Sequence, residues 1–298
     1  MPVRRYFVGV IRPNPRRTAR RLANRGGALL RVDPTAAHAL LVDATRLDPG
    51  LHEAWFDLAL LHKWSGSWDD AFQCNLRAAE LVGEQPEEPA WWNLGIAATA
   101  LRRWDVARRA WRTYGLAIPD GEGPIHGDYG YAAVRINPHS KPELVWGRRI
   151  DPARVQIENI PLPESDHRHG DIVLHDGEPV ATREVQGTSW LIFNEIERWE
   201  ASETPTVHAT ITAASPDTIN TLLAALEDAG FTAEDWTTNT TTSCVACSTQ
   251  PRRLAKPSSR ESHHQHSIGI VGPVESIRTV VTAWERSHNG HCRRLSTT

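Results

Sequence analysis

The chain has 298 residues, 40% of them hydrophobic and 23% charged, and its formal net charge is −3. This length favours two or three domains, and the near-neutral charge argues against a protein that binds polyanions over its whole surface. Because no apolar run approaches the roughly 18 residues that span a bilayer and the first residues lack the apolar core of a secretory signal, we expect a cytoplasmic protein with no membrane partner.

The first part of the chain is strongly basic. Nine arginines precede the first acidic residue, Asp33. Such a segment is typical of a nucleic-acid-binding arm or an organelle-targeting sequence. It is also compatible with a solvated helix face that follows a short strand at residues 6–11, and we favour this last interpretation.

A repeat of about 34 residues follows this basic start. The equivalent residues Ala37, Ala71 and Ala107 are 34 and 36 residues apart, and the two extra residues fall in the loop 83–89, where insertions cost little. Each copy also carries large residues at fixed positions, such as Trp55 and Trp91. Small residues let paired helices approach closely, and large ones fill the space to the next pair. The spacing therefore predicts a series of helical hairpins.

The pattern resembles the tetratricopeptide repeat (TPR) and covers residues 1–120, although the first copy keeps only its second helix clearly. The resemblance implies a curved stack whose first helices line a groove for a peptide or a partner helix. Two tryptophans in that groove are either anchors for the partner or packing residues that meet the following domain. The residues expected to face the groove are Phe56, Leu60, Lys63, Trp64, Trp92, Asn93 and Ile96.

Residues 121–205 form a β-rich segment. Short alternating or β-branched runs predict strands at 131–136, 144–149, 155–160, 171–175, 180–186 and 190–193. The dipeptide Asp176-Gly177 predicts a hairpin turn between two of them, and the set of short strands predicts a small β-barrel or curled sheet. The loop 164–171 concentrates ionisable side chains but matches no catalytic motif, so we interpret it as a polar surface loop.

Residues 206–298 alternate between strand and helix patterns. Strands are predicted at 206–212, 231–244, 267–271 and 291–295, and helices at 215–229 and 274–287. Ser215 and Gly230 are suitable N-terminal and C-terminal caps for the first helix. The order β-α-β-β-α-β is the ferredoxin-like pattern, which by itself carries little functional information. The whole chain is therefore expected to be a multidomain α+β protein.

Cysteine and histidine residues cluster in this last segment. Cys244 and Cys247 are separated by two residues, and His264 and His266 follow the loop 248–262. Two thiolates and two imidazoles form a tetrahedral ligand set for zinc and leave no position open for a substrate. The cluster therefore predicts a structural zinc site that holds the loop; the alternative is a set of free thiols, or a redox pair, beside a histidine run. If His291 or Cys292 replaced one of the histidines, the site could be open to a substrate.

Three functions follow from these patterns. The leading hypothesis is a non-enzymatic adaptor that binds a protein or peptide in its helical groove and has no catalytic residues. The second is an RNA- or nucleoprotein-associated factor, based on the arginine-rich start, the small barrel and the ferredoxin-like sheet; the isolated aromatic Trp236 counts against it. The third is a metal-dependent enzyme that uses the cysteine and histidine clusters.

Overall fold

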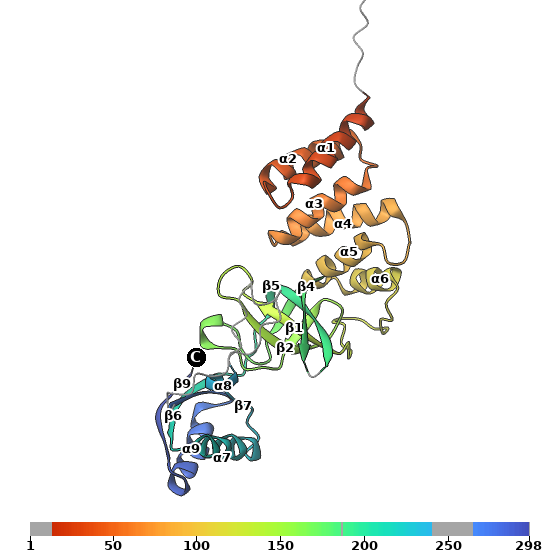
Figure 1. The fold of residues 1–298 in the computed structure, drawn as a ribbon. Helices are drawn as coiled ribbons and strands as arrows, with labels where there is room; N and C mark the ends of the chain where they lie inside the picture. Colours follow the sequence, from red (N-terminus) through yellow and green to blue (C-terminus); the bar gives the residue numbers. More distant parts are fainter. Residues whose placement is uncertain (1–13, 186, 240–264, 298) are drawn as a thin grey trace, which may run out of the picture. The chain divides into compact units, whose positions relative to one another are not determined.

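The computed structural model describes residues 14–185, 187–239 and 265–297 (Figure 1). The chain divides into two compact units, with the boundary in the sequence between Pro124 and Ile125. The first unit is helical, and the second contains two sheets. This composition confirms the expected α+β class. The strand expected at residues 6–11 lies outside the described residues.

The first unit consists of helices that pack in consecutive pairs. An upstream hairpin is complete, although its first helix has no clear signal in the sequence. That helix packs through the small residues Ala19, Ala23 and Gly26, so it lacks the large residues that mark the later copies. The helices are α1 (Pro15–Leu29), α2 (Pro34–Leu47), α3 (His52–Trp64), α4 (Trp68–Val82), α5 (Pro89–Ala100) and α6 (Trp104–Tyr114).

Local sequence explains where several of these helices begin and end. Asn14 and Asp33 are N-caps whose side chains accept hydrogen bonds from backbone N–H groups of the first turn. Proline occupies the first position of α1, α2 and α5, where its missing N–H costs nothing. Gly115 ends α6 in the left-handed conformation, which glycine adopts without steric cost.

Gly95 of α5 and Trp111 of α6 approach each other closely within the third hairpin. A Cβ atom at Gly95 would lie 2.6 Å from atoms of the Trp111 ring. Trp111 is fully buried, so its ring has little room to move away. The absence of a side chain at Gly95 is therefore what allows the indole to lie against the backbone of α5.

The second unit begins with a closed barrel of five strands, in which sequential neighbours are antiparallel and β1 closes on β5 in parallel. This confirms the expected small barrel. Its interior is apolar and includes Val134, Val145, Ile157 and Phe193. The strands are β1 (Tyr131–Ile136), β2 (Glu143–Arg149), β3 (Arg154–Ile157), β4 (Ile172–Val185) and β5 (Thr188–Glu200).

The hairpin turn predicted at Asp176-Gly177 is wrong. The chain continues through these residues as one strand, β4, which pairs with β5 on both sides of them but not at residues 176–178. Register shifts on both sides of Pro179 accommodate the irregular residues as bulges. The chain reverses only after Val185, where Gly187 has a φ of 80°. The dipeptide Asp176-Gly177 thus lies in a bulge of β4 and forms no hairpin turn, because the residues on both sides of it pair with β5.

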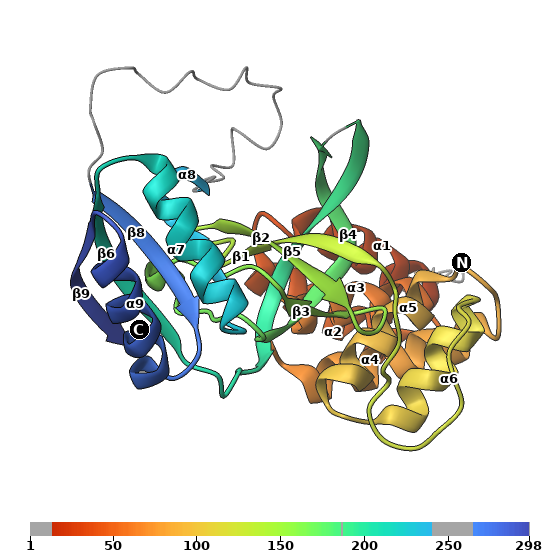
Figure 2. The ribbon, with the colours of Figure 1, turned by 90° about the horizontal axis from the view of Figure 1, so that it is seen from below.

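The four-stranded sheet that follows has the strand order β7-β8-β6-β9, with antiparallel neighbours. Helices α7 and α9 lie side by side against one face of it (Figure 2). The residues 236–239, expected to be extended, form a short helix instead. The elements are β6 (Thr206–Ala213), α7 (Pro216–Asp228), β7 (Ala233–Asp235), α8 (Trp236–Asn239), β8 (Gln265–Val271), α9 (Val274–Ser287) and β9 (Gly290–Thr297).

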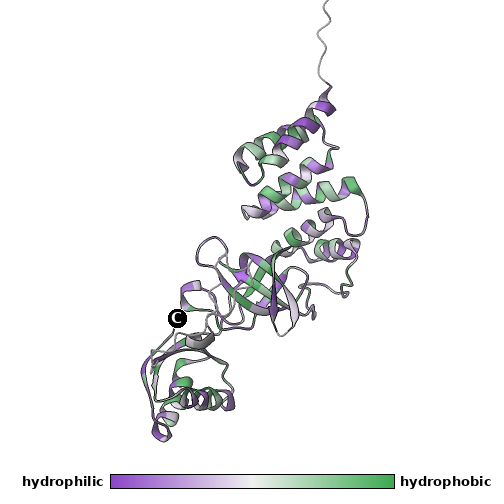
Figure 3. Ribbon diagram, in the orientation of Figure 1, coloured by the Kyte–Doolittle hydropathy of each residue, from purple (hydrophilic) through white to green (hydrophobic). Residues whose placement is uncertain are grey.

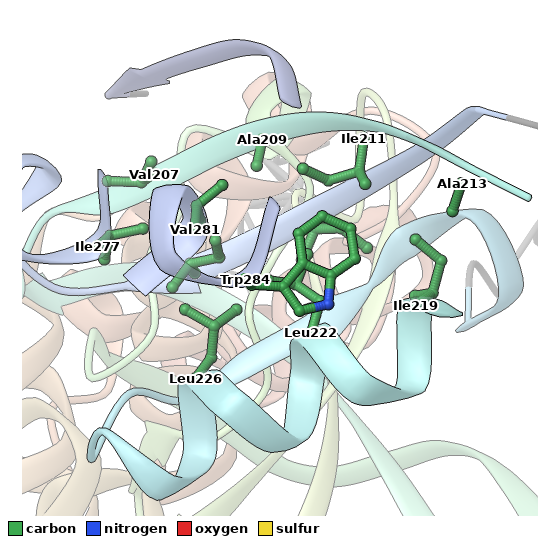
Figure 4. Close-up of a cluster of buried hydrophobic side chains, with 12 residues drawn as sticks. Val207, Ala209, Ile211, Ala213, Ile219, Leu222, Leu226, Ile277, Val281 and Trp284 are labelled. Carbon is green, nitrogen blue, oxygen red and sulfur yellow. The ribbon is translucent and has the colours of Figure 1, made fainter. Parts of the chain in front are cut away.

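The core of this layer lies between the sheet and the two helices. Figure 4 shows side chains of both helices pointing toward those of β6. Ser215 caps α7 by accepting a hydrogen bond from the Thr218 N–H, as its position in the sequence predicts. The labelled core residues are Val207, Ala209, Ile211, Ala213, Ile219, Leu222, Leu226, Ile277, Val281 and Trp284.

The face of the sheet that α7 and α9 do not cover makes polar contacts with the segment that follows β3. The indole N–H of Trp236 donates to the Ile160 carbonyl at 2.8 Å, and the Glu234 carboxylate accepts from the backbone N–H of Ile160 at 3.2 Å. A Cβ at Gly269 would overlap the Trp236 ring, so glycine at this position lets the indole lie flat on β8. In the part of the chain that the structure describes, no helix is long and apolar enough to cross a membrane.

Replacing Gly95 with alanine is expected to destabilise the first unit by about 1–3 kcal/mol, because the added methyl group overlaps the buried Trp111 ring. The matched control is Gly27→Ala in α1, where the nearest atom is the movable carboxylate oxygen of Asp57 and the gain in helix propensity is about 0.5–1 kcal/mol. Urea unfolding measures both variants. Equal stability of the two variants would contradict the close approach.

Candidate functional site

Three residues expected to face a groove form a stripe along α3. Phe56, Leu60 and Trp64 are spaced by four residues, which places them on one side of a helix, and all three are half-buried. We call these three residues the α3 stripe. They present aromatic and aliphatic surface that remains partly open to solvent.

Arg31 contacts the end of this stripe. Its guanidinium carbon lies 3.5 Å from the centre of the Trp64 ring, a cation–π arrangement. Arg31 is exposed, and Trp64 packs beneath it against the core that α1, α2 and α3 share. The sequence did not indicate Arg31, because it lies between α1 and α2 and reaches Trp64 only through the packing of the hairpins.

Lys63 and Asn93 have a different role from the one expected. The Lys63 ammonium donates to the Asn93 side-chain oxygen at 2.8 Å, and the Asn93 amide donates to the Pro89 carbonyl at 3.2 Å. Lys63 is 4% exposed and Asn93 6%. This hydrogen bond therefore links α3 to α5 and stabilises the stack. Because both side chains are buried, they leave little exposed surface for a partner to contact.

Trp92 and Ile96 also lie within the packing of the protein. The Trp92 ring is edge-on to Trp111 and Tyr114, with centroids 5.0 and 4.9 Å apart, so it packs back onto α6. Ile96 has no exposed surface. Among the expected residues, Lys63, Asn93 and Ile96 are buried, and Trp92 is half-buried on α5 against α6. The α3 stripe is the row of partly open side chains along a single helix.

The expected metal ligands are only partly within the described residues. Cys244, Cys247 and His264 lie outside them. His266 lies in β8, where its Nδ1 is 2.8 Å from the Asp235 carboxylate, and both side chains are buried. The reserve ligands His291 and Cys292 lie in β9, which is separated from β8 by β6, and both contact Glu285. Within residues 14–185, 187–239 and 265–297, no three His, Cys, Asp or Glu side chains are arranged to hold a metal ion.

The loop 164–171, expected to be a polar surface loop, instead has a buried histidine. Nε2 of His167 lies 2.6 Å from the Glu195 carboxylate, and its Nδ1 lies 2.9 Å from the Ser165 carbonyl. The second oxygen of Glu195 accepts from the Asn137 N–H at 2.8 Å. The sequence did not indicate Glu195, because it lies in β5, 28 residues from His167, in an ordinary strand pattern.

The electrostatics of this cluster favour a protonated histidine. Burial lowers the pKa of His167, but the hydrogen bond and charge of Glu195 outweigh burial, so the pKa is raised overall. Burial raises the pKa of nearby Glu143 to about 7, although that carboxyl accepts a hydrogen bond from the Leu162 N–H. Both nitrogens of His167 and both oxygens of Glu195 have protein partners, so this cluster fastens the loop rather than presenting a reactive atom.

Glu195→Gln is expected to lower the pKa of His167, because the amide removes the charge that favours the imidazolium. Since the folded-state pKa of His167 is raised, its contribution to stability is full below the unfolded value near 6.5 and is lost as the pH rises through the folded value. The destabilisation by Glu195→Gln should therefore be larger at low pH than at high pH. NMR titration of the His167 ring and urea unfolding at several pH values measure these effects.

The control for this experiment is Glu178→Gln, which changes an exposed carboxylate of the same barrel. It should leave the His167 titration where it is in the wild type. A His167 pKa that does not move in Glu195→Gln would show that the two side chains are not paired.

Comparison with known proteins does not extend these observations. No family model matches the chain, and no curated protein matches it. One solved structure that it resembles is that of a hypothetical protein from Neisseria gonorrhoeae, at 17% sequence identity and a TM-score of 0.26, covering 56% of this chain and 94% of that chain. A likeness this weak carries no argument about fold or function.

Proposed function

We propose that the protein is a non-enzymatic adaptor whose TPR-like stack binds a peptide or a helix of a partner protein along α3. The observation that carries the proposal is the α3 stripe, a row of half-buried apolar side chains on the first helix of a hairpin. Partly open aromatic side chains at a fixed spacing are typical anchors for an amphipathic partner.

The arrangement of the hairpins supports the TPR-like assignment. Three helical pairs follow one another at the spacing seen in the sequence, and the small residues Ala59, Ala71 and Ala107 are all buried. Lys63 and Asn93 hold neighbouring hairpins together beside the stripe. A surface that is fixed before the partner arrives loses less conformational entropy on binding.

The partner should be apolar opposite the stripe. Leu60 and Phe56 provide aliphatic and aromatic surface, and the exposed guanidinium of Arg31 lies over Trp64 at one end. An acidic residue in the partner next to this apolar segment would complement Arg31. The preferred ligand is therefore a short amphipathic protein segment.

The C-terminal sheet is assigned to the ferredoxin-like class as part of the same proposal. Its strand order, second-third-first-fourth in chain order, with both long helices on one face, supports that assignment. In the adaptor it would supply a second surface. The assignment concerns the fold and adds no activity.

The double variant Leu60→Glu/Trp64→Ala is expected to lose the partner proteins that the wild type retains in a pull-down, with unchanged helicity by circular dichroism. A charge at Leu60 and the missing indole remove the apolar contact without touching the buried Lys63–Asn93 link. Mass spectrometry of the retained proteins measures the loss.

The matched control is Trp68→Ala/Trp104→Ala, which removes half-buried tryptophans that begin the second helices of two hairpins. These side chains lie off α3, so the partners should be retained. If the Leu60→Glu/Trp64→Ala protein keeps all its partners while remaining folded, α3 is not the binding surface.

A structural zinc ion is the second element of the proposal, with Cys244, Cys247, His264 and His266 as its ligands. The support comes from Asp235, which accepts a hydrogen bond from Nδ1 of His266 and thereby leaves Nε2 as the atom that would face a metal. Histidines that bind zinc commonly donate their other ring N–H to a carboxylate. When bound, the ion would supply a cross-link that holds the loop between the two ligand pairs.

Purified protein is expected to contain about one zinc ion per chain, and Cys244→Ser should lower that content. Cys74→Ala is the control, because Cys74 is buried in α4 of the other unit and should not affect the metal. Elemental analysis in chelator-free buffer measures both. Zinc-free wild-type protein would exclude the metal without affecting the proposal for α3.

A further inference from the structure

One face of α1 is built almost entirely of positive charge. Its arginines are all exposed. Arg17, Arg21 and Arg25 lie on the side of the helix opposite the buried residues Ala19, Ala23 and Gly26, and Arg16 and Arg20 lie on the flank of that side. Hydrophilic residues accordingly run along α1 (Figure 3). We call this surface the α1 arginine face; it consists of Arg16, Arg17, Arg20, Arg21 and Arg25.

No acidic residue lies within this stretch of the sequence. Residues 14–32 contain no Asp or Glu, and the first turn of α1 has no acidic residue. Among the residues that the structure describes, none forms an ion pair with these five arginines. Elsewhere in the same unit exposed arginines do have acidic neighbours, such as Arg46 with Asp43 and Arg109 with Glu84.

The placement of these charges opposes helix stability. Three pairs separated by four residues, 16–20, 17–21 and 21–25, bring like charges together, which destabilises a helix. Arg16 and Arg17 also lie in the first turn, where the helix dipole is positive and favours anions. A bound row of negative charges would remove both effects at once. The helix is thus expected to be more stable when a polyanion covers its arginine face.

We propose that the α1 arginine face binds the phosphate backbone of a nucleic acid, without preference for base sequence. From Arg16 to Arg25 the helix rises about 14 Å, which corresponds to about four phosphates along one strand. Guanidinium groups bind phosphate oxygens in pairs.

Other features of the structure support this choice of partner and of surface. A membrane-bound amphipathic helix needs its apolar face free for insertion, whereas that face of α1 packs against α2, with Gly26 against Leu41. The ferredoxin-like sheet offers little alternative for stacking bases, since Trp236 is 5% exposed and its N–H bonds to Ile160. The positive helix is therefore the surface that matches a phosphate chain.

The test is fluorescence anisotropy of a labelled 20-nucleotide oligouridine RNA with the full-length chain over a salt series. Arg20→Gln/Arg21→Gln is expected to weaken binding about tenfold or more and to make the salt dependence shallower by about 1.4 in log–log slope, as expected for two lost phosphate contacts on a single strand. The melting temperature without RNA should stay the same or rise, because the like-charged pairs are removed.

The control variant is Arg278→Gln/Arg286→Gln, which removes two exposed arginines from α9 and changes the net charge equally. It should bind RNA like the wild type, and so should Leu60→Glu/Trp64→Ala, which keeps this test independent of the α3 stripe. Equal losses in both arginine variants would overturn the proposal. Tighter binding of polyglutamate, or of phosphatidylserine vesicles, than of RNA at the same ionic strength would also overturn it.

Discussion

The close packing of helices through small side chains is the constraint on which the first unit depends. Gly26 meets Leu41 across the first hairpin, and Gly95 meets Trp111 across the third. At such contacts a single methyl group has no space, because helix interfaces are packed as densely as a protein core. The contact at Gly95 determines how closely α5 lies against α6. The Lys63–Asn93 link in turn joins α5 to α3, the helix that carries the α3 stripe.

The second unit depends instead on polar groups that are buried together with their partners. Arg154 and Asp151 form an ion pair at 2.6 Å with almost no exposed surface, and Arg154 also donates to the Ile125 carbonyl. Two further pairs, His167 with Glu195 and His266 with Asp235, are likewise buried and hydrogen-bonded to each other. Burying such groups without partners would cost several kcal/mol each, roughly. These pairs therefore account for loop placement, and a perturbed pKa among them does not by itself mark an active site.

The two surfaces for which we propose a function differ from these pairs because their side chains keep surface that the fold does not bury. Phe56, Leu60 and Trp64 keep part of their apolar area open, and the five arginines of the α1 arginine face are exposed and form no ion pair among the described residues. One surface suits an apolar protein segment and the other a chain of phosphates. A protein with both could hold a partner protein close to a nucleic acid, which unites the adaptor hypothesis with the arginine-rich start of the sequence.

The sequence by itself determined the features that depend on neighbouring residues. The spacing of small and large residues marked the hairpins of α3 to α6, alternating runs marked β1 and β6, and Ser215 marked the start of α7. It placed the α3 stripe on one helix for the same reason, since a helical period of 3.6 is a local property.

The tertiary structure decided everything that required a distant partner. It buried Lys63 against Asn93, turned Trp92 onto Trp111, and placed Arg31 over Trp64. It also carried β4 past Gly177 without reversing the chain, because the residues on both sides of the irregular segment pair with β5. His167 and Glu195 meet only because the barrel closes β5 beside the loop that follows β3. A residue's exposure and its partners arise from contacts across the fold, and no local pattern contains them.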